Sequence, residues 1–340
     1  MKRRMALGFV FALTLLALLV YFVGSQGIVD ELSGADVRLL GLGFLSGLLA
    51  LTFRGMVWER FITLVDTTMS RRVICGVFLS AMFIKYATPY GQVTTEPFVA
   101  YLVARNGEMA YEDGLASILS ADLLNYVPYY TFGFLGLTII TVSGALSNGM
   151  VAQFTAFGVL FVVVTSVVLT VVRRPSLVYR IVLRFAGIVR VATGRFTDRF
   201  TTQLSEVTIR ERLDRFYTTV ETITTNRRTL VVATIYAHLG MAFLMLPVYI
   251  GAMALGHQLS LPVVAIVVAL GKLGTVVPAP GGTGGVEAIV TAGLTTLGQL
   301  DPAAAFTIAL IYRLCTYWLT IGVGGISTAS LIVRDSYASH

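Results

Sequence analysis

Long apolar runs separated by short polar links make up most of this chain. At a rise of 1.5 Å per residue, a run of about 20 residues can cross a hydrocarbon core of ~30 Å. Two further apolar runs are interrupted by proline and glycine, which break helices and leave pieces too short to span. The pattern predicts an all-α polytopic membrane protein with about six full transmembrane helices and two interrupted segments. The six runs are residues 5–24, 37–58, 114–144, 150–172, 230–255 and 303–333, and the interrupted ones are residues 73–104 and 261–297.

The composition agrees with this class, and the charged residues orient the helices. Of the 340 residues, 56% are hydrophobic and only 13% are charged, which is too apolar for a soluble globule. Lys2, Arg3 and Arg4 precede the first run and Arg334 follows the last, so both termini are expected on the cytoplasmic side of the plasma membrane. A cleaved signal peptide is the alternative for the first run, but its apolar length exceeds the usual ~7–15 residues.

The largest polar stretch, residues 173–228, holds twelve arginines and five acidic residues, which accounts for the whole net charge of +7. Apolar residues recur in it at helical spacing with arginines interleaved, as in an amphipathic helix that lies on the inner leaflet. Anionic inner-leaflet lipids are therefore its expected partner. Nucleic acid is not an expected partner, because no aromatic-interleaved platform or docking motif accompanies the basic residues.

The basic residues Arg173 and Arg174 also decide on which side each interrupted segment enters the membrane. Each full span carries the chain to the other side of the membrane. Followed back from that cytoplasmic end, the spans place both ends of residues 73–104 on the cytoplasmic face, so this segment is expected to be a re-entrant hairpin. Followed forward, they place both ends of residues 261–297 outside, so this segment is expected to be a re-entrant hairpin from the outside. The chain is thus expected to comprise a first helix with an outer loop (1–36), a first repeat (37–172), the basic insertion (173–228) and a second repeat (229–340).

The two interruptions match each other without a gap at an offset of 191 residues, and the register continues into the span that follows each one. Because the two segments enter from opposite sides, the repeat is predicted to be inverted. Secondary transporters use such inverted repeats, with the substrate held near the midplane by broken helices of the two halves. The matched pairs are Pro89 and Pro280, Gly91 and Gly282, Glu96 and Glu287, Asp122 and Arg313, and Tyr126 and Tyr317.

Once the charges at the ends of the spans, Arg54 among them, are set aside, three basic and three acidic residues remain at or near membrane depth. An ionised group at a helix centre costs roughly 2.5–3.5 kcal/mol, so these residues are expected to pair or to face water. Glu96 and Glu287 begin the second piece of each interrupted segment, where a carboxylate can cap the helix or, once desolvated, carry a proton. Asp122 fits a structural ion pair and a functional role equally well. The six residues are Lys85, Glu96, Asp122, Lys272, Glu287 and Arg313.

The second interruption supplies candidate anion binders. Arg313 offers a planar fork that suits phosphate, Lys272 offers a compact charge, and glycine N–H groups can form an anion-holding concavity. The run is not a P-loop, because it lacks the Gly-Lys-Ser/Thr ending. No cofactor, metal site or nucleophile with a base is predicted. The candidate substrate-binding residues are Lys85, Lys272, Gly281, Gly282, Gly284, Gly285, Arg313 and Tyr317.

The second interruption, residues 278–287, resembles the signature of the lysylphosphatidylglycerol synthase/flippase transmembrane family, a group of flippase-like integral membrane proteins. Residues 88–98, with Tyr101 and Arg105 after them, resemble its first-half partner. The resemblance covers residues 37–333. It implies a lipid translocase, for aminoacylated phospholipid in some members and polyprenyl-phosphate-linked sugars in others.

The chain departs from the bifunctional members of that family in two ways. It ends at His340 without the soluble synthase domain, so it is not expected to make lysyl-lipid itself. It also lacks the arginine that the resemblance would place near Gly91, which argues against a symmetric pair of anion sites.

Together these features predict a non-enzymatic translocase that moves an anionic phospholipid or a polyprenyl-phosphate-linked lipid through a polar cavity between the two halves. The first alternative is a secondary transporter of a small anionic solute, and the second is a non-transporting membrane subunit of a lipid or glycan pathway. A second copy of the chain or a glycan- or lipid-synthesis enzyme is the expected protein partner. Proton coupling, ion coupling and passive scrambling all stay open.

Overall fold

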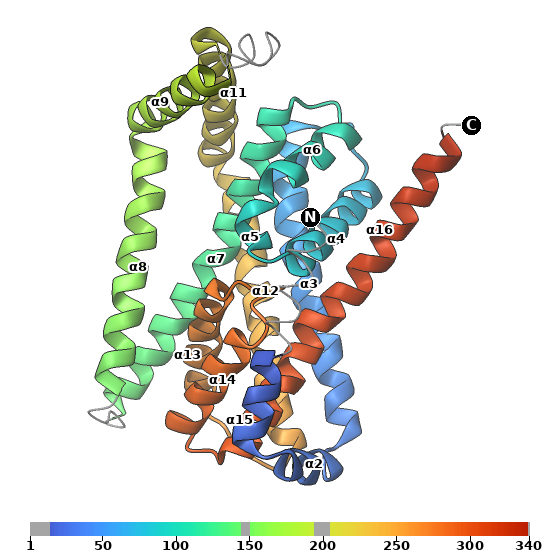
Figure 1. Cartoon of the computed structure of the whole chain (residues 1–340), viewed down its shortest axis with the longest axis vertical. Helices are drawn as coiled ribbons and strands as arrows, with labels where there is room; N and C mark the ends of the chain where they lie inside the picture. Colours follow the sequence, from blue (N-terminus) through green and yellow to red (C-terminus); the bar gives the residue numbers. More distant parts are fainter. Residues whose placement is uncertain (1–13, 144–149, 194–204, 339–340) are drawn as a thin grey trace.

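A computed structural model describes residues 14–143, 150–193 and 205–338, and these residues form helices joined by short links. Within these ranges no strand is formed, and the β-type pairing consists of one isolated bridge. The predicted all-α class is confirmed. Figure 1 shows an elongated bundle in which α8 (Met150–Arg173) stands along one side.

Four helical segments among the described residues are long and apolar enough to cross a membrane. A fifth is added if the helix Thr14–Val23 and α2 (Ser25–Ser33), which are bent by 80° relative to each other, form one span. The 24-residue helix α8 forms where another span was predicted, and the count of six stays a prediction. Three of the segments are α3 (Val37–Val65), α7 (Tyr111–Val142) and α12 (Arg227–Ala254). The fourth, Pro302–Leu331, comprises α15 (Pro302–Arg313) and most of α16 (Leu319–Ala338), which follow each other along one helical segment.

The link at residues 25–36 was predicted as a loop, and this is wrong, because α2 occupies most of it. The chain turns at Gly24, whose φ is 92°. Residues other than glycine rarely adopt this backbone conformation, because their β-carbon hinders it. The turn lays α2 against α15, where a β-carbon at Gly27 would lie 3.0 Å from the Ala303 side chain. Glu31 of α2 also lies 3.2 Å from the His257 ring. These contacts explain why a polar link becomes helical.

Both interrupted helices break where proline and glycine predict. The first consists of α4 (Arg71–Ala87), the four-residue α5 (Gly91–Thr94) and α6 (Glu96–Asn106). The second consists of α13 (Leu261–Gly271), a 3-10 turn (Lys272–Val276) and α14 (Gly285–Thr296). In Figure 1, α4 and α6 lie toward the end that carries α9 (Pro175–Thr193) and α11 (Glu206–Thr225), and α13 and α14 lie toward the other end.

The two breaks meet in the interior of the bundle. Pro89 and Pro280, which the repeat register equates, form the isolated antiparallel bridge. Two apolar cores flank this junction: one joins α3, α4, α6 and α7, and the other joins α12, α13, α14 and α15. Residues of α3, α7 and α12 belong to both cores, so these three helices tie the two parts of the bundle together. Pro280 is buried at this junction and Pro89 is half-buried, whereas Tyr90 and Val276 of the two breaks are exposed.

Candidate functional site

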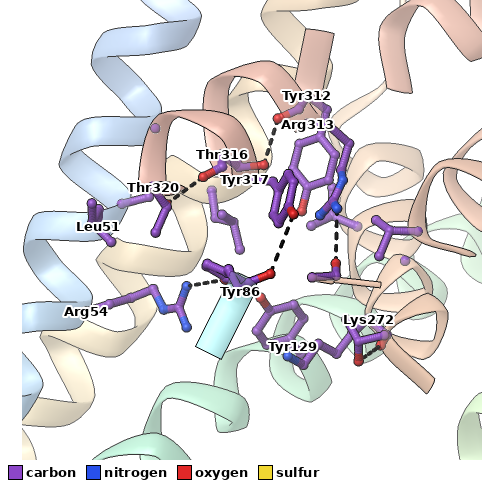
Figure 2. A pocket seen from close by; sticks show the side chains of 18 residues that line it. Leu51, Arg54, Tyr86, Tyr129, Lys272, Tyr312, Arg313, Thr316, Tyr317 and Thr320 are labelled. Atoms are coloured by element: carbon purple, nitrogen blue, oxygen red, sulfur yellow. Dashed lines mark hydrogen bonds between the residues drawn. The ribbon is translucent and has the colours of Figure 1, made fainter. Parts of the chain in front are cut away.

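A small cavity of about 50 Å³ lies beside the junction of the two breaks. Three basic side chains from three elements line it: Arg54 of α3, Lys272 of the 3-10 turn and Arg313 at the end of α15. No carboxylate is among the described residues that line it. Figure 2 shows these bases around the tyrosines Tyr86 and Tyr129. We call this space the cation cavity.

Arg313 is held by a buried ion pair with Glu287. Its Nε donates to Glu287 Oε1 at 2.9 Å, and the two residues are only 6% and 2% exposed. The other Glu287 oxygen accepts the N–H of Gly284 at 2.7 Å, so the carboxylate also caps α14. An Arg313 Nη donates to the carbonyl of Gly281 at 3.0 Å. Glu287 therefore caps α14 and pairs with Arg313, and the proton-carrying role stays a prediction.

The chain leaves Arg313 through a π-helical turn, Leu314–Trp318. Such turns are rare and concentrate at functional sites, because they redirect side chains relative to a regular helix. Here Tyr317 of the turn lies under Arg313, with the guanidinium 4.1 Å from the ring centroid. A β-carbon at Gly281 would collide with the Tyr317 ring, so the close approach requires glycine at that position.

Three of the four glycines expected to form an anion-holding concavity use their N–H groups for hydrogen bonds within the protein. The N–H of Gly282 donates to the carbonyl of Ala279 at 2.9 Å, and that of Gly285 donates to the carbonyl of Gly282 at 3.1 Å. The N–H of Gly284 is occupied by Glu287. Of the four glycines in the candidate set, only Gly281 lines the cation cavity. The run is tightly folded on itself, and this folding uses the donors that an anion would need.

Lys272 lies against two tyrosines of α7. Its Nζ is 4.6 Å from the ring centroid of Tyr126 and 5.8 Å from that of Tyr129. The repeat register equates Tyr126 with Tyr317, the ring under Arg313. Each of these matched tyrosines therefore lies against a base of the cation cavity, an arrangement that stabilises a desolvated cation.

Sequence reasoning missed Arg54. The predicted span ended at residue 58, which placed Arg54 among the cytoplasmic arginines, whereas α3 runs to Val65 and Arg54 lies well inside the helix. Its Nη1 is 3.4 Å from the Tyr86 hydroxyl, and its buried Nε has no hydrogen-bond partner in the described part of the chain. The apolar residues after Arg60, Phe61-Ile62-Thr63-Leu64-Val65, were the available signal.

Lys85, Glu96 and Asp122 form a separate group, the Lys85 cluster. Lys85 Nζ contacts Glu96 Oε1 at 2.8 Å and also Asp122 Oδ2. The indole Nε1 of Trp58 donates to Asp122 Oδ1 at 2.8 Å. The other oxygen of Glu96 is buried without a hydrogen-bond partner among the described residues. Lys85 was expected to bind substrate, but it does not line the cation cavity and instead holds two acids.

Comparison with known proteins agrees with this description. The family model for the lysylphosphatidylglycerol synthase transmembrane region matches residues 5–324. A "UPF0104 membrane protein" of Methanothermobacter thermautotrophicus is 25% identical over 330 residues, which cover 95% of this chain and 94% of the relative. A second protein of that description, from Pyrococcus horikoshii, is 21% identical over 324 residues, or 93% and 94% of the two chains. The protein is therefore an integral membrane protein that belongs to the lysylphosphatidylglycerol synthase transmembrane family.

Proposed function

We propose that this protein is a translocase that moves the headgroup of an anionic lipid through the cation cavity. The observation that carries the proposal is the charge of the lining: Arg54, Lys272 and Arg313 surround one buried space whose described lining holds no carboxylate. Buried cations are costly in an apolar medium, so such a lining favours an anion as its occupant. A phosphate group suits it, because arginine and lysine both bind phosphate strongly.

The unsatisfied donor of Arg54 points to the same occupant. No acidic residue in the described part of the chain lies within ion-pair distance of Arg54, and its Nε donor is buried without a partner. A buried donor without an acceptor costs roughly 1–3 kcal/mol, more for a charged group. An anion in the cavity supplies the missing acceptor, which would offset this cost.

Transport requires that the junction open, because a cavity of about 50 Å³ is large enough for a few water molecules but not for a lipid headgroup. An inverted repeat supports such an opening, since rocking of one half against the other exposes a central site to each side in turn. Three observations favour the repeat: the constant offset of 191 residues, the bridge between the matched prolines Pro89 and Pro280, and the matched tyrosines beside two cavity bases. We further propose that α9 and α11 mark the cytoplasmic end, at the plasma membrane.

The test is lipid movement in proteoliposomes made with a fluorescent anionic phospholipid, read by quenching of the outer leaflet. Arg54→Gln and Lys272→Gln are each expected to slow movement at least tenfold. Arg60→Gln is the matched control, because Arg60 lies on the same helix and contacts Tyr236 outside the cavity. Movement at the normal rate in both cavity variants would refute the proposal.

A small anionic solute is the second candidate substrate, and the small volume of the cavity favours it. The same proteoliposomes distinguish the two substrates. Uptake of radiolabelled phosphate, without movement of labelled lipid, would establish the solute transporter and exclude the lipid translocase.

A further inference from the structure

A large apolar groove runs between α7 and α8, and residues of α11 and the start of α12 also line it. Its volume is about 640 Å³, within the range of sites that bind small organic molecules. Apart from hydroxyl groups, its lining is apolar and aromatic. Phe161 of α8 contacts Tyr130 and Phe134 of α7, with ring centroids 5.0 and 4.9 Å apart. In Figure 1, α8 stands along one side of the bundle, apart from most of the other helices. We call it the α7–α8 groove.

The α7–α8 groove and the cation cavity are separated by one side chain. Tyr126 lines the groove, and the same ring lies 4.6 Å from the Nζ of Lys272, which lines the cavity. Tyr129, one turn further along α7, lines the cavity and lies 6.3 Å from Tyr126 between ring centroids. The apolar groove and the cation cavity thus lie next to each other. The hydrocarbon chain and the anionic headgroup of a lipid are arranged in the same way.

We propose that the α7–α8 groove binds one hydrocarbon chain of the anionic lipid whose headgroup enters the cation cavity, with Tyr126 at the boundary between them. This inference rests on the proposed function, since it assigns the chain of the same substrate. Lipid chains are as apolar as the groove, so the groove alone gives little preference for any lipid over the surrounding bilayer. The selection comes from Lys272, which attracts an anionic headgroup to the point where the groove ends.

Photolabelling of the full-length protein in nanodiscs tests this dependence on Lys272. The probes are phosphatidylglycerol and phosphatidylcholine, each with a diazirine on the acyl chain, and the labelled peptides are mapped by mass spectrometry. We expect the anionic probe to label groove residues of α7 and α8 at least fivefold more than the zwitterionic probe. Lys272→Gln is expected to remove this difference. Equal labelling by the two probes, or an undiminished preference in Lys272→Gln, would show that the groove holds only bulk lipid.

Bulky substitutions in the groove provide a second test. Leu123 and Val127 of α7 line the groove and are 40% and 45% exposed, so a tryptophan there fills the groove without entering the packed core. Leu123→Trp and Val127→Trp are each expected to reduce lipid movement and groove labelling about tenfold. Leu135→Trp is the matched control, because Leu135 is 56% exposed on the same helix and does not line the groove. Thermal unfolding in detergent verifies that all three variants fold.

The outcomes separate this inference from the proposed function. If the native protein moves lipid and the two groove variants move it equally fast, the groove assignment is wrong and the translocase proposal stands. If the native protein moves no lipid but the groove labels with anionic preference, the groove is a lipid site and the translocase proposal is wrong.

Discussion

The two halves of the protein neutralise their buried charges differently. In the second half, one arginine meets one carboxylate, and both oxygens of Glu287 accept hydrogen bonds. In the Lys85 cluster, one lysine meets two carboxylates, and one oxygen of Glu96 has no partner in the described part of the chain. At the constant offset of 191 residues, a glutamate stands at both 96 and 287, but Asp122 stands where the second half has Arg313.

This difference gives the two halves different charge balances. The pair of Arg313 and Glu287 is neutral, so it places a base at the cation cavity without adding net charge. The Lys85 cluster carries a surplus negative charge when all three groups are ionised, and one bound proton removes it.

The largest expected effect comes from breaking the pair of Arg313 and Glu287. Glu287→Gln leaves the arginine buried without a carboxylate, and removal of one partner of a buried pair costs about 3–5 kcal/mol. We expect a large loss of thermal stability in detergent. The double variant Glu287→Gln/Arg313→Gln is expected to regain part of that loss, because no lone charge remains. A single variant as stable as the native protein would show that the pair is not a structural lock.

A smaller effect that depends on pH is expected from Lys85→Gln. The loss of the lysine leaves two adjacent acids, but these are 12% and 13% exposed and Asp122 keeps the Trp58 hydrogen bond. We expect a destabilisation of roughly 2–4 kcal/mol at neutral pH, somewhat below the cost for a fully buried pair. Acidification should reduce it, because protonation removes the repulsion between the two carboxylates.

The control for that experiment is the double variant Lys85→Gln/Glu96→Gln, which has one acid and no adjacent like charge. Its stability should be higher than that of Lys85→Gln and should vary less between pH 5 and 8. If the two variants show the same pH dependence in thermal unfolding, the cluster does not act as a shared proton site.

The smallest expected effect comes from the matched tyrosines. A cation over an aromatic ring contributes about 0.5–2 kcal/mol, depending on desolvation. Tyr126→Leu and Tyr317→Leu should therefore each raise the lipid concentration for half-maximal transport about 3- to 10-fold. Tyr317→Leu should also lower the stability, because Tyr317 is only 3% exposed and the smaller side chain leaves a cavity. Tyr249→Leu, in α12 and outside the cavity lining, is the control. A change confined to one of the two tyrosines would show that the halves contribute unequally to the cavity.

The sequence by itself determined the class of the protein, the two helix breaks, their constant offset and the need for the buried charges to pair or to face water. These follow from local properties: hydropathy, the backbone limits of proline and glycine, and the cost of a lone charge in an apolar medium. The requirement that charges pair already pointed to a base for Asp122 and an acid for Arg313.

Only the tertiary structure decided which charges face the cavity. Lys85 was expected to bind substrate and instead holds two acids, whereas Arg54 was assigned to a helix end and instead lines the cavity. The N–H groups of Gly282, Gly284 and Gly285 were expected to bind an anion, and they instead donate to groups within the turn and to Glu287. The reason is physical. The groups that a side chain faces depend on how helices nearly 200 residues apart in sequence pack together, and a local sequence pattern does not specify that packing.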